Sequence, residues 1–176
     1  MQRNAKMGLA LMITKGNMTI FFREHDPFSN WFQSEFEVKG VRFCCMEQMM
    51  MFAKAKLFGD EETARKILLA TNPRDHKALG RSVAGYIDSI WAERRVRIVA
   101  HGCYAKFSQN PTLKAALLAT GETKLVEANP YDRIWGVGLA EHDPRILNPE
   151  TWNGQNLLGV VLEQVRAQLQ TAQTGS

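Results

Sequence analysis

Two ionisable side chains in an otherwise apolar segment are the first sign of chemistry in this chain. Glu47 and Lys54 lie seven residues apart within residues 43–59, and this spacing returns to the same face of a helix ~10.5 Å further along its axis. The segment around them is rich in cysteine, methionine and phenylalanine, so both charged groups would lose water on folding. Their separation is too long for a direct salt bridge, but it suits a small polar ligand held between them.

The same two residues also have a purely structural explanation. Each side chain can reach the rim of the helix and pair with another element, and ion pairs of that kind perturb titration just as catalytic groups do. The spacing by itself leaves both explanations open.

A second unusual segment, residues 129–138, follows a predicted strand at 124–128. It contains Asp132, Arg133, Trp135 and Gly136. A loop that leaves a strand with a glycine, an acid and an aromatic residue is a common way to direct side chains at a ligand. We therefore expect this loop to contribute to a binding site.

The elements that must position these residues can be read from caps and periodicity. Residues 43–59 contain good helix formers and no proline, and Gly59 stands where a left-handed cap would end a helix. Asp60 and Asn72 are expected to cap the next two helices. The remaining predicted elements are a strand at 18–23, a loop at 25–31, a hairpin at 35–43 turning at Lys39–Gly40, helices at 60–69, 72–80, 88–107 and 110–121, a loop at 141–155, and a final helix at 157–169 capped by Asn156.

Length and composition bound the class of protein. A chain of 176 residues with 45% hydrophobic content suits one domain, which we place at residues 18–170. The many predicted helices and few short strands indicate an α+β fold, mostly helical with a small antiparallel sheet. Residues 1–17 and 171–176 are expected to be tails. The three cysteines form no CxxC pair and indicate a reducing, cytoplasmic compartment. The four histidines show no metal-ligand spacing, so no metal is expected.

Charge and hydropathy narrow the partners further. The formal net charge is +4, which would suit a phosphorylated or nucleic-acid substrate without deciding for one. No apolar run approaches the ~20 residues that a membrane-spanning helix needs, so no membrane association is expected. The sequence gives no indication of the oligomeric state.

Several segments, taken together and in order, resemble the NADAR family, also called YbiA-like. The likeness covers about residues 18–169. The segments that carry it are Phe28–Trp31, the helix from Glu47 to Phe58, Ala78–Arg81, Trp91, Tyr104–Asn110, Asp132–Gly138 and Asn156–Gly159.

The resemblance implies an enzyme that hydrolyses an N-glycosyl bond and needs no cofactor. Members of the family cleave ribosylaminopyrimidine phosphates of the riboflavin pathway or remove ADP-ribose from guanine in DNA, so modified DNA is a candidate partner. It places catalytic roles on Glu47, Lys54 and Asp132, and substrate contacts on Trp91 and Trp135. Where many relatives have Glu-His-Tyr, this chain has Glu47-Gln48-Met49, which weakens the case for the riboflavin-type substrate.

The chemistry implied by the family admits two routes. Cleavage builds positive charge at the anomeric carbon, so Glu47 and Asp132 can share the tasks of stabilising that charge and activating water. Alternatively, a desolvated Lys54 can attack the opened sugar as a Schiff-base nucleophile. The sequence does not choose between them.

The other substrate-binding candidates have equally ordinary alternatives. Trp91 and Trp135 can stack on a nucleobase, although the helical position of Trp91 alone would indicate a core residue. Asn30 can bond a ribose hydroxyl or simply form a turn. The arginines can bind phosphate or be solvated surface residues; they are Arg23, Arg81 and Arg133.

Two other classes of function remain. The chain can be a non-catalytic ADP-ribose or nucleotide-binding module that keeps the pocket without turnover, although it would then have no need for all three of Glu47, Lys54 and Asp132. A structural or interaction protein would leave the loop at 129–138 without a purpose.

Overall fold

The computed structural model describes residues 12–174 and their side chains through residue 172. The chain divides into two compact units, one formed by the described residues up to Ser29 together with those from Pro111 onward, the other by residues 30–110. The prediction of a mostly helical α+β fold is confirmed. Among the described residues, none of the helices has the length and apolar character needed to cross a membrane.

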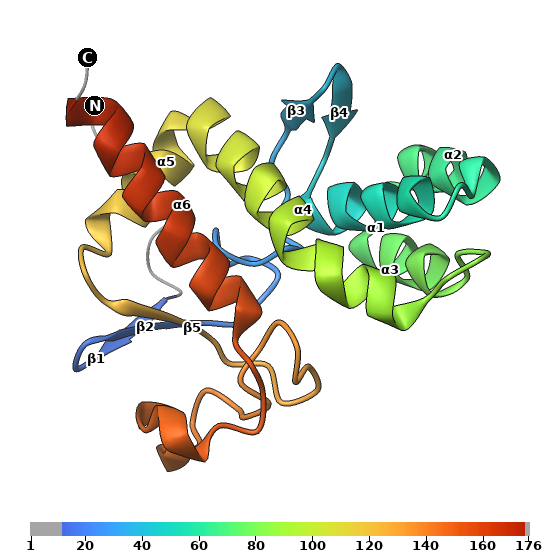
Figure 1. Cartoon of the computed structure of the whole chain (residues 1–176). Helices are drawn as coiled ribbons and strands as arrows, with labels where there is room; N and C mark the ends of the chain where they lie inside the picture. The colour runs from blue at the N-terminus through green and yellow to red at the C-terminus, as the bar shows by residue number, and fades with distance from the viewer. Residues whose placement is uncertain (1–11, 175–176) are drawn as a thin grey trace. The chain divides into compact units, whose positions relative to one another are not determined.

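The unit of residues 30–110 is built around one buried helix, α1 (Met46–Leu57), which packs against α2 (Glu61–Leu69), α3 (Pro73–Arg81) and α4 (Asp88–Gln109) (Figure 1). Methionines fill the spaces between these helices, as the apolar sequence of α1 predicts. The buried ones are Met46, Met49, Met50 and Met51.

The predicted helix boundaries are largely confirmed by their caps. Asp60 accepts a hydrogen bond from the Thr63 N–H at 3.0 Å at the start of α2, and Asn72 accepts one from the Arg74 N–H at 2.9 Å at the start of α3. Gly59 has φ +74° just beyond α1. Asp88 is the first residue of α4, as the predicted helix at 88–107 requires, and its carboxylate accepts from the Tyr86 hydroxyl at 2.7 Å.

A short hairpin precedes α1 and explains why the helix starts later than Phe43. Strand β3 (Phe36–Val38) pairs with β4 (Val41–Phe43) across Lys39 and Gly40, whose consecutive positive φ values of 52° and 80° suit a two-residue turn. Phe43 pairs with Phe36, and its ring centroid lies 5.4 Å from that of Phe52 in α1. The strand therefore holds Phe43, and the helix begins at Met46.

The other unit has a three-stranded sheet with the order β1–β2–β5. Strands β1 (Ile13–Lys15) and β2 (Met18–Phe21) are antiparallel, whereas β2 and β5 (Lys124–Glu127) are parallel. The expected sheet was wholly antiparallel, so the parallel pair corrects that detail. Helix α5 (Pro111–Ala119), the short 3-10 helices η1 (Pro144–Leu147) and η2 (Pro149–Thr151), and α6 (Leu157–Thr174) complete this unit.

Both expected tails are shorter than the sequence indicated. Residues 13–15 form β1, because Gly16, with φ +58°, lets the chain turn back so that Lys15 pairs with Met18. Residues 1–11 lie outside the described part. At the other end, α6 continues through Thr174 and includes most of the expected tail at 171–176; residues 175 and 176 lie outside the described part.

The start of α6 is fixed to β5, and the two elements pack against each other within this unit (Figure 1). The Asn156 side chain does not cap α6 as predicted. Its carboxamide accepts from the Glu127 N–H at 3.0 Å and donates to the Leu125 carbonyl at 2.8 Å, so it replaces a strand partner. Gly159 follows one turn later, where a Cβ atom would collide with the Leu125 carbonyl oxygen.

We expect Gly159→Ala to lower the free energy of unfolding by about 3 kcal/mol, because backbone atoms of β5 leave no room for a methyl group. Chemical denaturation measures the change. Val160→Ala, at an exposed position of the same helix, serves as the control and is expected to change stability by less than about 0.5 kcal/mol. Equal stability of the two variants would show that the contact is not tight.

Candidate active site

Glu47 lies in the first turn of α1 with its side chain buried at 5% exposure. Its N–H donates to the Asn30 carbonyl at 2.8 Å, so Asn30 is fixed beside the start of the helix. The side-chain oxygen of Asn30 is buried and, within residues 12–174, has no hydrogen-bond partner. A buried acceptor without a donor costs about 1–3 kcal/mol, and a ligand hydroxyl is a group that would satisfy it.

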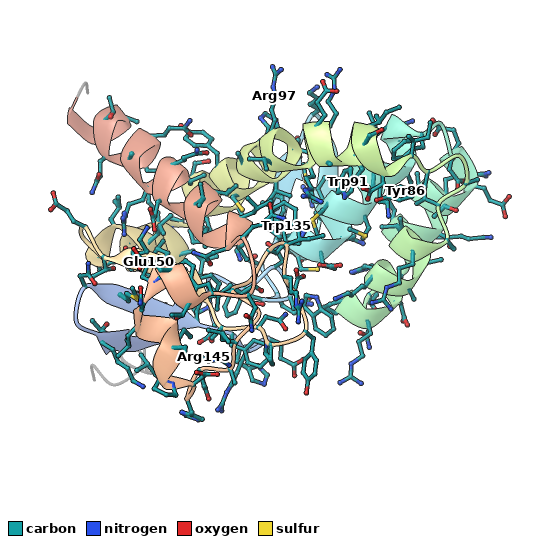
Figure 2. All side chains as sticks on the ribbon, turned by 60° about the horizontal axis from the view of Figure 1, so that its bottom comes forward. Tyr86, Trp91, Arg97, Trp135, Arg145 and Glu150 are labelled. Carbon is teal, nitrogen blue, oxygen red and sulfur yellow. The ribbon has the colours of Figure 1, made fainter. Side chains whose placement is uncertain are left out.

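Lys54 lies two turns further along α1, where its ammonium group meets both a carbonyl and aromatic rings. Nζ donates to the Gly80 carbonyl of α3 at 2.7 Å and lies 4.1 Å from the centroid of the Tyr86 ring. The Trp91 ring, from the first turn of α4, is 6.0 Å away. Figure 2 labels both rings where α4 begins. The predicted helix face is thus present, with a carboxylate and an amine on it.

Desolvation lowers the pKa of Lys54, while the nearby carboxylates of Asp88 and Glu47 act in the opposite direction. Burial is the largest cause, so more of the free amine is present near neutral pH than on an ordinary lysine. The contribution of Glu47 also means that the two groups on this face interact electrostatically.

Gly80 explains how α3 reaches Lys54. A Cβ atom at this position would collide with the Met51 sulfur of α1, so glycine permits the close approach that brings its carbonyl to Nζ. In the segment Ala78–Arg81, Gly80 therefore both allows α3 to pack closely on α1 and accepts the hydrogen bond from Lys54.

Gln48 and Met49 take structural positions in α1. The Gln48 carboxamide accepts from the Cys44 N–H at 2.8 Å and donates to the carbonyls of Ile67 at 3.0 Å and Ala70 at 3.2 Å. Both residues are buried. Gln48 thus ties the start of α1 to the end of α2, and its amide group offers no titratable proton.

In the other unit, Asp132 organises its own loop. One carboxylate oxygen accepts from the N–H groups of Ile134 and Trp135, both at 2.8 Å. Asp132 itself is partly exposed, whereas Trp135 is buried at 9% exposure. The loop turns sharply because of these bonds, which use only one of the two carboxylate oxygens.

The same loop forms the platform on which α6 begins. The carbonyls of Ile134 and Trp135 accept from the N–H groups of Leu157 and Leu158. The first N–H groups of a helix have no acceptor inside the helix, so the loop supplies one for each of these two. Gly136 packs so closely that a Cβ atom would lie 2.9 Å from that of Asn129. Asp132–Gly138 is therefore a well-packed loop whose backbone is tied to the start of α6.

The remaining predicted residues differ in how available they are. Arg81 and Arg133 are exposed at the end of α3 and in the loop. Arg23 forms an ion pair with Glu141 at 2.9 Å, so its guanidinium is already engaged. Trp91 is buried at 7% exposure, and little of its ring is open for stacking. The roles of all four in binding stay predictions.

Two neighbours of Lys54 were missed by sequence reasoning. Tyr86 places its ring against Nζ, and Asp88 both accepts from the Tyr86 hydroxyl and acts on the pKa of Lys54. They belong to the connection and first turn before Trp91, more than 30 residues from Lys54, and carry no recognisable spacing. Only the packing of α4 on α1 brings them there.

A mostly helical α+β fold with a carboxylate and a desolvated lysine on one buried helix face defines a candidate hydrolase, and comparison with known proteins agrees. The sequence description of the NADAR domain matches residues 20–170. The chain belongs to the NADAR domain family.

The relatives support the class of activity. The chain is 38% identical to protein irg-1 of Caenorhabditis elegans over 170 residues, which is 88% of this chain and 80% of that protein. It is 40% identical to N-glycosidase R617 of Acanthamoeba polyphaga mimivirus over 148 residues, 81% of this chain and 87% of that one. The expected class, a hydrolase of N-glycosyl bonds, is confirmed.

Two further comparisons bear on substrate and fold. Riboflavin biosynthesis protein VVA0006 of Vibrio vulnificus is 30% identical over 155 residues, covering 86% of this chain but 38% of that protein. The NMR structure of the Escherichia coli protein YbiA matches with a TM-score of 0.77 at 24% identity, covering 99% of this chain and 97% of that one. The second comparison establishes the fold.

We expect Asp132→Asn to keep the free energy of unfolding within about 0.5 kcal/mol, because the amide oxygen still accepts from the two loop N–H groups. Asp132→Ala removes that acceptor and is expected to cost about 2 kcal/mol. Denaturation of the two variants side by side measures the difference. Equal losses would mean that the hydrogen bonds of Asp132 do not hold the loop.

Proposed function

We propose that this protein hydrolyses an N-ribosyl bond and removes ADP-ribose from guanine in nucleic acid. The observation that carries the proposal is one face of α1, on which a buried Glu47 and a partly buried, desolvated Lys54 lie two turns apart. The unpaired oxygen of Asn30 beside Glu47 supplies an acceptor suited to a sugar hydroxyl.

In the water route, Glu47 acts as the general base. The carboxylate takes a proton from water, the water oxygen bonds to the anomeric carbon, and the electron pair of the broken C–N bond passes to the guanine nitrogen. The proton held by Glu47 is then delivered to that nitrogen, which leaves the carboxylate ready for another cycle. On the family resemblance, Asp132 is proposed as the second carboxylate and Trp135 as a substrate-binding ring. Within its own unit, Asp132 has an oxygen that the loop bonds do not use.

In the amine route, Lys54 acts as a nucleophile. With the ribose ring open, C1 forms a C=N bond to the guanine nitrogen. Nζ adds to C1, its two protons pass to the guanine nitrogen, the bond between C1 and that nitrogen breaks, and an imine remains on Lys54; water then hydrolyses that imine to free sugar and amine. The lowered pKa favours this role because only the unprotonated amine can attack.

Two features favour a nucleic-acid substrate. The net charge is +4, and basic side chains are exposed in both units, including Arg81 at the end of α3 and Arg133 in the loop. Arg97 extends outward from α4 in Figure 2. Gln48 stands where many relatives have histidine, and its amide is used in hydrogen bonds to the backbone. It therefore cannot act as the acid or base that a histidine could supply for a riboflavin-type substrate.

A second candidate substrate is a ribosylaminopyrimidine phosphate. It is favoured by the similarity to riboflavin biosynthesis protein VVA0006. Its cleavage would use the same carboxylate and amine, since the bond broken is again between an anomeric carbon and nitrogen.

Incubation with both substrates tests the proposal directly. The purified protein is mixed with DNA carrying ADP-ribosylated guanine and, separately, with a ribosylaminopyrimidine phosphate, and the released sugar is measured by mass spectrometry. We expect release from the DNA. Release only from the pyrimidine would identify the second substrate, binding without release would indicate a non-catalytic module, and neither would refute an N-ribosyl ligand.

We expect Glu47→Gln to lower kcat at least ~100-fold while substrate still binds, because the change keeps size and removes only the base. Single-turnover kinetics and a binding titration measure the two effects. Glu62→Gln is the matched control, since Glu62 is an exposed helical glutamate paired with Lys66. Turnover of Glu47→Gln at the parent rate would exclude Glu47 as the base.

Borohydride added during turnover is expected to trap the sugar on Lys54, because its lowered pKa keeps free amine available. Lys56 is the control on the same helix, where its ammonium is exposed and paired with Glu61. Peptide mapping locates the adduct. An active sample with no adduct, or with equal labelling of both lysines, would eliminate the amine route and leave the water route.

A further inference from the structure

Three soft metal ligands converge where α1 begins. Cys44 and Cys45 connect β4 to α1, and His76 lies in α3, 31 residues after Cys45. The two sulfur atoms and a ring nitrogen all lie within 4.8 Å of one another. Sequence reasoning found no metal-ligand spacing because the histidine arrives through the packing of α3 on α1.

The tautomer of His76 is set for coordination. Its Nε2 lies 2.8 Å from the Ala70 carbonyl oxygen, which can only accept, so Nε2 carries the proton. Nδ1 then keeps its lone pair, and it lies 3.6 Å from Cys45 Sγ. Metal-binding histidines are usually oriented by such a bond from the second ring nitrogen to a carbonyl.

The spacing also matches zinc. With Zn–S bonds of about 2.3 Å and Zn–N bonds of about 2.0 Å, tetrahedral coordination places a sulfur and a nitrogen ligand about 3.5 Å apart. The observed distance of 3.6 Å between Cys45 Sγ and His76 Nδ1 matches this value. The three ligand atoms together lie within 4.8 Å of one another, so the Cys44 side chain has to move inward to complete the site. Thiolate and imidazole ligands favour zinc over magnesium or calcium.

We propose that Cys44, Cys45 and His76 bind one Zn²⁺ ion, with the fourth position filled by water on the side of Cys44. Cys45 and His76 are fully buried, whereas Cys44 is half-buried and gives the ion a route of entry. This site is independent of the proposed function, because none of its three ligands belongs to the candidate catalytic residues.

The position of the site indicates what the ion does. Cys45 is the N-cap residue of α1 and makes no side-chain cap bond. Gln48 and His76 both donate to the Ala70 carbonyl, so the backbone at the end of α2 already holds one ligand in place. Zinc would join the start of α1 covalently to α3 and stabilise the helix face that carries Glu47.

A thiol–imidazole hydrogen bond explains the Cys45–His76 pair but not the third ligand. Cys44 stands beside the pair with its sulfur directed into the same group.

Zinc binding by the reduced full-length protein tests the site. The protein is equilibrated with Zn²⁺, passed over a chelating resin and analysed for metal; Co²⁺ is then substituted to look for thiolate-to-metal charge-transfer absorption. We expect one ion per chain and a charge-transfer band. Cys44→Ser should weaken binding at least ~100-fold, whereas Cys103→Ala, which removes a buried thiol of α4 outside the group, should leave it unchanged.

Alkylation of Cys44 provides a second readout that does not require a variant to fold. Iodoacetamide should label this half-exposed thiol in the metal-free protein and be excluded once Zn²⁺ is bound. Absence of zinc in the wild-type protein, equal binding by folded Cys44→Ser, Co²⁺ bound without a thiolate band, or labelling indifferent to zinc would each overturn the proposal.

Discussion

Burial of ionisable groups on an apolar helix is the constraint on which the unit of residues 30–110 depends. Four buried methionines pack α1 against its neighbours, and the polar groups of Glu47 and Lys54 on the same helix still need partners in place of water. For Lys54 a backbone group does part of this, because the Gly80 carbonyl accepts a hydrogen bond from the amine. The neighbouring carboxylates offset only part of the loss of water around the Lys54 ammonium, so its pKa is lowered. A lower pKa makes more of the unprotonated amine available as a nucleophile.

The same use of backbone recurs in the other unit, where the loop Asp132–Gly138 and the start of α6 satisfy each other. Loop carbonyls accept from the first helical N–H groups, while Asn156 pairs with β5 in place of a strand. The loop Asp132–Gly138 and Asn156, which both belong to segments that resemble the family, thus hold the start of α6 in place. Asp132 combines a structural role with room for a second one, since one carboxylate oxygen accepts both loop hydrogen bonds and the other takes no part in them.

Local signals allowed much of the fold to be predicted. Asp60 and Asn72 capped helices as expected, and the expected turn formed at Lys39–Gly40, where the glycine adopts positive φ without strain. The pairing of strands distant in sequence could not be predicted. Phe43 lies in strand β4, residues 13–15 pair with β2, and β5 pairs in parallel with β2. At the site, the face shared by Glu47 and Lys54 followed from helical periodicity, whereas Tyr86 and His76 reached their partners only through helix packing.

The most direct measurement is an experimental structure of Glu47→Gln with uncleaved ADP-ribosylated guanine DNA bound. Catalysis from α1 requires the anomeric carbon within about 3.5 Å of an ordered water or of Lys54 Nζ, with a ribose hydroxyl donating to the Asn30 side chain. That arrangement is the predicted result. A sugar bound away from α1, with Asn30 still unpaired, would contradict the assignment of this helix face as the active site.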